Sequence, residues 1–150
     1  MPDIISTDHP LTRAQQLLLA ALLDTLVPAS DDGTMPSAAD VGFDAYLLAQ
    51  AEDFIPVLIS ALQRFEPSFV DLPLADRCER VREFSATDSS LFQALLTRIY
   101  DCYYQNDRVR VQIGVATGAP FPQGNQVPQG DLSLLDPVIE HSERHAYRKR

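Results

Sequence analysis

Two histidines near the end of the sequence have the spacing of metal ligands. His141 and His145 are four residues apart, so a helix would place both on one face, with Glu140 or Glu143 as a third ligand. The segment follows Pro137, is highly charged and lies close to the last residue, where helices fray. We interpret it as a turn of surface helix and keep metal binding as the weaker alternative.

An acidic loop, Asp31-Asp32-Gly33, is a second candidate for cation binding. A calcium loop of the EF-hand type needs oxygen ligands at alternating positions and a glutamate at its end. The stretch Ala29–Pro36 has neither of these features. Its residue types favour turns, so we predict a connection between two helices.

Motifs for nucleophilic or nucleotide chemistry do not occur in this chain. The sequence has no G-x-S-x-G, no Glu-x-x-His, no G-x-G-x-x-G and no P-loop. Its two cysteines, Cys78 and Cys102, form no C-x-x-C pair, and we expect reduced thiols that are at least partly buried. We therefore predict no catalytic residue and no cofactor bound by this chain.

Three of the five tyrosines end the most apolar helical segment. A tyrosine combines a large apolar body with a polar tip, which suits partly hydrated interfaces. We expect Tyr100 and Tyr103 to lie in the core with their hydroxyls reaching the surface. Tyr104 points elsewhere on the helix, so we predict that it belongs to an interface, together with Asp107 and Arg108 in the turn that follows.

Caps and apolar spacing predict the helices that position these residues. Thr12 and Gln15 have the form of a capping box, and the apolar helix that follows ends at Pro28. A second start signal at 37–40 precedes the next helix. We assign the inner face of that helix to Val41, Ala45 and Leu48. Three further apolar residues widen this face, namely Phe43, Tyr46 and Leu47.

A third helix is predicted from a cap at Asp53, with Pro56 in its first turn, as far as Pro67. A short charged helix then covers Leu74–Phe84. The fifth and most hydrophobic helix starts from a cap at one of two neighbouring residues, Thr87 or Asp88.

The last helix of the bundle is expected after Asn106 and ends at Gly114, a residue suited to the C-terminal cap position. The stretch Val109–Val115 also alternates as a strand does, but its cap and the neighbouring helices favour a helix.

The fold class that follows is all-α, a bundle of about five or six helices in a single domain. Residues 1–10 form an N-terminal tail, 11–114 the bundle, and 115–150 an extended Pro/Gly-rich arm with a basic tail. Phe121 is the single large aromatic side chain of the arm, so we predict that it anchors the arm on this bundle or on a partner.

Charge and hydropathy exclude some kinds of partner. A net charge of −9 and a pI near 4.6 disfavour nucleic acid, because phosphate contacts require a surplus of Lys and Arg. The longest apolar run, Leu17–Leu23, is far below the ~20 residues that span a bilayer, so direct membrane insertion is not expected. The N-terminal residues lack the features of a signal peptide, so we expect a cytoplasmic location, or a periplasmic one through an exported partner.

Three stretches resemble the gluconate 2-dehydrogenase subunit 3 family, the small subunits of membrane-associated flavoprotein dehydrogenases. Leu11–Pro28 ends in Asp24-Thr-Leu-Val-Pro28 before the acidic glycine loop, and is similar to the family's opening helix. Ile99–Val109 is similar to the family's helix that ends in Y-x-x-Y-Y. The proline-rich arm after a glycine-ended helix also resembles the end of the family's sequences, where Tyr147-Arg148 corresponds to a Y-R. A twin-arginine signal, common in the family, is missing here.

The resemblance implies a non-catalytic subunit whose partner is a large FAD-dependent dehydrogenase of sugars, sugar acids or alcohols. A cytochrome c subunit is a further candidate partner, and FAD would be held by the large subunit. The small subunit is expected to support maturation or export of its partner. The residues leave two other hypotheses open, a self-contained ligand- or metal-binding protein and a homo-oligomer whose arm packs on a neighbouring copy.

Overall fold

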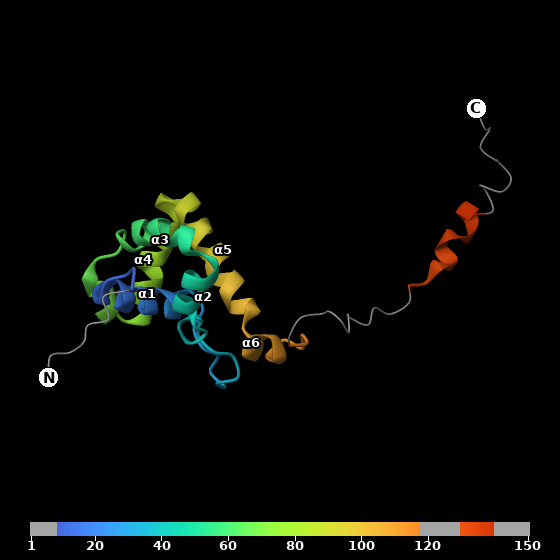
Figure 1. Ribbon diagram of the computed structural model, residues 1–150, viewed down its shortest axis with the longest axis horizontal. Helices are drawn as coiled ribbons and strands as arrows, with labels where there is room; N and C mark the ends of the chain where they lie inside the picture. Colours follow the sequence, from blue (N-terminus) through green and yellow to red (C-terminus); the bar gives the residue numbers. More distant parts are fainter. Residues whose placement is uncertain (1–8, 118–129, 140–150) are drawn as a thin grey trace, which may run out of the picture. The chain divides into compact units, whose positions relative to one another are not determined.

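The structure is a computed structural model that describes residues 9–117 and 130–139 (Figure 1). The chain divides into two compact units, 1–118 and 119–150, which are described separately below. The described residues contain helices and no strand, so the predicted all-α class is confirmed. The first unit holds six α-helices: α1 (Arg13–Leu26), α2 (Phe43–Gln50), α3 (Ile55–Leu62), α4 (Leu74–Thr87), α5 (Ser89–Gln105) and α6 (Asp107–Gln112).

Helix α1 begins where the capping box predicts. Thr12 Oγ1 accepts a hydrogen bond from the backbone N–H of Gln15 at 3.2 Å, and Gln15 Oε1 accepts one from the N–H of Thr12 at 2.8 Å. The helix buries Leu18, Leu19 and Leu22 among other side chains in the centre of the unit. Arg77 joins α4 to α1, because its Nη1 donates to the backbone oxygen of Ala21 at 3.1 Å.

The segment after Ser37 differs from the prediction. Ser37 does cap a helical turn, but this is the 3-10 turn η1 (Ala38–Asp40), and Gly42, with φ +77°, separates it from α2. The break resets the helical phase. The face predicted from Val41, Ala45 and Leu48 is therefore wrong, because Leu48 and Ala45 are exposed and the buried residues are Phe43, Tyr46 and Leu47.

One predicted helix start is wrong, and for another the structure selects one of the two predicted caps. Asp53 is not a cap, since it lies inside the 3-10 turn η2 (Glu52–Phe54), and α3 starts after it without a side-chain cap. Helix α4 continues to Thr87, so of the two candidate caps for α5 it is Asp88 whose carboxylate accepts the N–H of Leu91, at 3.4 Å. A further 3-10 turn, η3 (Pro67–Asp71), leads from α3 to α4.

The end of the first unit follows the predicted caps. Asn106 Oδ1 accepts the N–H of Arg108 at 3.0 Å, and Gly114, with φ +76°, follows the last turn, so the helical interpretation of this stretch is confirmed. Cys78 is partly buried and Cys102 buried, both as free thiols, as predicted. Burial raises the pKa of the Cys102 thiol to about 11.

The described part of the second unit is short. Residues 132–135 form the 3-10 turn η4, and 136–139 are α-helical. Asp131 caps the turn, because its carboxylate accepts the N–H of Ser133 at 3.0 Å. Hydrogen bonding from the Ser133 side chain, and then from this N–H, lowers the pKa of Asp131. Phe121, His141, His145, Tyr147 and Arg148 lie outside the described residues, so the predictions about them stay predictions.

Candidate interaction surface

The three tyrosines at the end of α5 have different environments. Tyr103 is only 3% exposed, and its hydroxyl donates to the backbone oxygen of Pro36 at 2.8 Å. The hydroxyl of Tyr103 was predicted to reach the surface, and this prediction is wrong. The hydroxyl instead joins α5 to the loop that precedes η1. Desolvation, and to a lesser extent the neighbouring Tyr104, raises the pKa of Tyr103, while Arg108 acts in the opposite direction.

Tyr100 and Tyr104 lie outside the core. Tyr100 is 42% exposed, so its predicted place in the core is wrong, and Tyr104 is 52% exposed. Their ring centroids are 5.9 Å apart, and the ring of Tyr104 also stands edge-on to that of buried Tyr103 at 5.3 Å. The ring of Tyr104 thus packs against a buried ring that is held by a hydrogen bond.

Asp107 and Arg108 open α6 beside these rings. Arg108 Nη2 donates to the backbone oxygen of Gly33 at 3.4 Å, a second link between this end of the unit and the loop before η1. Asp107 lies 3.8 Å from Arg110 in an exposed ion pair, which contributes little free energy. Beyond them, three further apolar side chains are exposed, namely Val111, Ile113 and Val115.

We name as the α5–α6 surface the exposed side chains of Tyr100, Tyr104, Val111, Ile113 and Val115. These residues come from two helices that contact each other and from the residues just after α6. Exposed polar residues, among them Gln105, Asp107 and Arg108, lie between these side chains along the chain, and the two tyrosines are of a type that dominates binding energy in protein interfaces. Its position agrees with the predicted interface at Tyr104–Arg108, although whether a partner binds there stays a prediction.

The acidic loop is ordered by its own hydrogen bonds. The carboxylate of Asp32 accepts the Ser30 hydroxyl at 2.6 Å, the Thr34 hydroxyl at 2.8 Å and the Thr34 N–H at 3.0 Å. These bonds, that of the Ser30 side chain first, lower the pKa of Asp32. Within residues 9–117 and 130–139, no three His, Cys, Asp or Glu side chains are grouped as a metal site would require.

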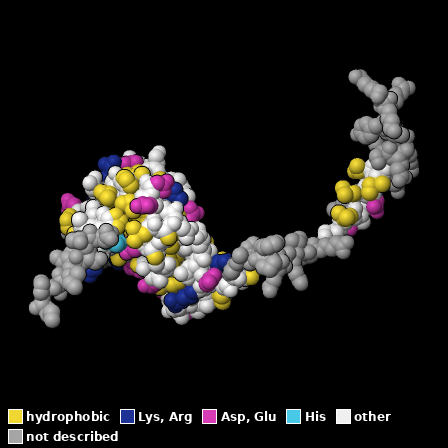
Figure 2. Space-filling model, viewed as in Figure 1, with side chains coloured by type: hydrophobic (Ala, Val, Ile, Leu, Met, Phe, Trp, Pro, Cys, Tyr) yellow, Lys and Arg dark blue, Asp and Glu magenta, His cyan; other side chains and the backbone are white. Residues whose placement is uncertain are grey.

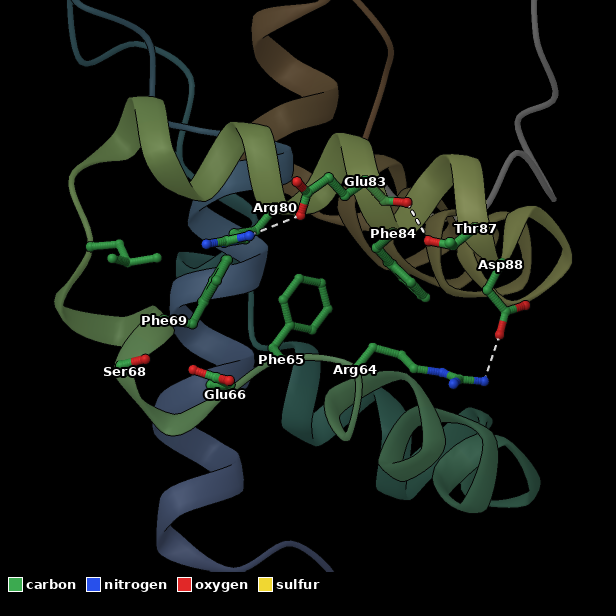
Figure 3. A pocket seen from close by; sticks show the side chains of 11 residues that line it. Arg64, Phe65, Glu66, Ser68, Phe69, Arg80, Glu83, Phe84, Thr87 and Asp88 are labelled. Atoms are coloured by element: carbon green, nitrogen blue, oxygen red, sulfur yellow. Dashed lines mark hydrogen bonds and ion pairs between the residues drawn. The ribbon is translucent and has the colours of Figure 1, made fainter.

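A cleft of about 600 Å³ lies on a different part of the first unit (Figure 3). The side chains of Phe65, Phe69 and Phe84 converge on it, and their rings meet edge-to-face with centroids 4.8 and 5.3 Å apart. Two guanidinium groups line it, but each is already paired, Arg64 with Asp88 at 2.7 Å and Arg80 with a glutamate one turn along α4 at 3.0 Å.

The cleft could not be found from the sequence, because its lining comes from the end of α3, η3, α4 and the start of α5. Each residue there has an ordinary structural role when taken alone. Since all three rings are buried and both cations are neutralised, the cleft offers a ligand little apolar surface and no uncompensated positive charge.

The described part of the second unit also exposes apolar side chains. Leu132, Leu135, Val138 and Ile139 are all exposed, and Figure 2 shows that hydrophobic atoms dominate this short segment. The spacing of Leu132, Leu135 and Ile139 is that of one helical face, the pattern that docks into a groove on another protein.

Comparisons with known proteins leave the family assignment as a prediction. No protein-family model, no curated protein and no solved structure matches the chain. Among the described residues, no single helix is long and apolar enough to cross a membrane. Taken together, α2 and the η2–α3 segment are long and apolar enough, but they are bent by 104° at the break between them.

Proposed function

We propose that this chain is a non-catalytic accessory subunit that binds a larger FAD-dependent dehydrogenase and supports its maturation or export. The observation that carries the binding role is the α5–α6 surface, where Tyr100 and Tyr104 are exposed on a support of buried groups. The identity of the partner is carried by the resemblance of Leu11–Pro28 and Ile99–Val109 to the small-subunit family.

The α5–α6 surface is suited to binding because it needs little rearrangement. A tyrosine ring loses less conformational entropy in an interface than a long flexible side chain does, and here Tyr103 and Arg108 already hold the helix ends on the loop before η1. The exposed face of Leu132–Ile139 provides a second contact of the kind that fits an apolar groove.

Co-expression with a candidate large FAD-dependent dehydrogenase subunit tests the proposal. We expect a yellow complex that survives size-exclusion chromatography at micromolar concentration and buries upwards of ~1,000 Å². Replacing Tyr104 with Ala should weaken the complex by about 1–2 kcal/mol, the loss typical of a central aromatic residue. Leu17→Ala is the matched control, because Leu17 is an equally exposed apolar residue of α1.

Separate migration of the two proteins would overturn the proposal. The alternative of a homo-oligomer is favoured by the same exposed apolar residues, and light scattering on the isolated chain separates the two, since only an oligomer gives a stable multiple of 16.7 kDa. The ligand- or metal-binding alternative is tested by metal analysis of the purified chain together with its melting temperature in the presence and absence of a chelator.

A further inference from the structure

Helix α2 exposes apolar side chains in the middle of its outer side. It buries Phe43, Tyr46 and Leu47, whereas Ala45, Leu48 and Ala49 on the opposite side are exposed, and Leu48 is 48% exposed. An amphipathic surface helix carries charged or polar residues on its outer side. On α2 the exposed polar residues, Asp44 and Gln50, stand only at the two edges of this apolar strip.

Helix α4 of the same unit shows what a solvated outer face looks like. Its outer side is charged, and two ion pairs spaced i,i+3 run along it, Arg80–Glu83 and Arg82–Glu79. The two helices of this unit therefore differ in the residues that they expose.

The exposed charged side chains of η1, α2 and η2 are all negative, while one cation, Arg98 of α5, lies over the ring of Phe54 in η2. Asp40 of η1 and Asp44 precede the apolar residues, and Glu52 and Asp53 of η2 follow them; all four are exposed, and both turns contact α2. From residue 14 to residue 63 the sequence has seven carboxylates and no Lys, Arg or His. The described residues contain no ion pair to any of these four carboxylates.

We propose that this α2 face, meaning Ala45, Leu48 and Ala49 with the four carboxylates around them, binds a partner segment that has apolar side chains flanked by Lys or Arg. Charge complementarity selects this occupant, because an apolar centre with a negative rim attracts a positively charged rim and repels a negative one. A second copy of the same face is disfavoured for that reason. The α2 face shares no residue with the α5–α6 surface, so either proposal can fail without the other.

A peptide titration of the full-length chain tests the inference. The probe is a synthetic amphipathic peptide with leucines on one helical face and Lys or Arg at both ends, and the control peptide has Glu in place of every Lys and Arg. We expect the basic peptide to shift the backbone amide NMR signals of α2 and η2, and the acidic peptide to leave them in place.

Two pairs of variants separate a specific site from general attraction to an acidic protein. Leu48→Gln should weaken binding about fivefold, whereas Leu17→Gln, which removes a 50% exposed leucine of α1, should not. The triple variant D44N/E52Q/D53N should weaken binding roughly tenfold at low salt. The triple variant E66Q/D71N/D76N changes the net charge equally through exposed residues elsewhere and should have less than a threefold effect.

Several results would overturn the inference. Signal changes mainly outside η1, α2 and η2, equal losses in the two triple variants, or equal binding of the acidic peptide would each show non-specific attraction. Self-association of the chain that Leu48→Gln abolishes would identify a second copy as the occupant instead.

Discussion

The hydrogen bond between Tyr103 and Pro36 is the clearest point at which to test how the α5–α6 surface is supported. Tyr103→Phe removes one hydroxyl and keeps the ring, so the edge-on contact with Tyr104 remains. The backbone oxygen of Pro36, a buried residue, loses this donor. Leaving a buried acceptor unsatisfied costs about 1–3 kcal/mol in the free energy of unfolding.

Urea denaturation followed by circular dichroism measures this cost. With an m-value of ~2 kcal/mol/M, a loss of ~2 kcal/mol lowers the midpoint by about 1 M while m stays constant. Tyr104→Phe is the control, since its side chain is half exposed, and it should change the stability by less than ~0.5 kcal/mol. A Tyr103→Phe midpoint equal to that of the control would refute the reasoning.

Ionisation of Tyr103 provides a test of the burial of its side chain. The folded protein raises the pKa of Tyr103 above its unfolded value of ~10, so the unfolded state releases the proton first. Stability is therefore fully present below pH ~10 and falls as the pH rises above it towards the higher pKa of the folded state. The phenylalanine variant should lose this part of the alkaline dependence.

Three further predictions concern separate features of the first unit. Iodoacetamide at pH 8 should modify Cys78 in the native protein and Cys102 only after unfolding, because a pKa of about 11 leaves about 10⁻³ of the buried thiol ionised; mass spectrometry of timed samples checks this order. Gly42→Ala should lower the free energy of unfolding, measured by thermal denaturation, by about 1–2 kcal/mol. The loss comes from the backbone conformation at φ +77° alone, since a Cβ there meets no other atom within 4 Å. Asp32→Asn should lose the stability that the lowered carboxyl pKa gives the wild-type protein above pH ~4. The wild-type protein loses the same stability as the pH falls through the pKa of the folded state, so the melting temperatures of both proteins should converge in acid.

Local hydrogen bonding explains which helices could be predicted from the sequence. The capping box at Thr12, the cap at Asn106 and the glycine at 114 all act within a few residues, and all three are present in the structure. The inner face of α2 was mispredicted because the phase of a helix is lost at a left-handed glycine, which a count of apolar spacing ignores.

The candidate surface was only partly predictable, because its support is long-range. The exposure of Tyr104 followed from its position on α5, whereas the partner of Tyr103 lies 67 residues away and the partner of Arg108 lies 75 residues away. The cleft next to Phe65 likewise depends on which elements meet, and a pattern along the chain does not contain that information.

These two long-range links set an order of assembly during synthesis. The loop around Gly33 leaves the ribosome first, and Arg108, which donates a hydrogen bond to it, follows 75 residues later. At elongation rates of ~5–20 residues per second, this interval is roughly 4–15 s. The α5–α6 surface is therefore completed only when α6 has been translated, so the partner that we propose could bind there only after the rest of the first unit has been synthesised.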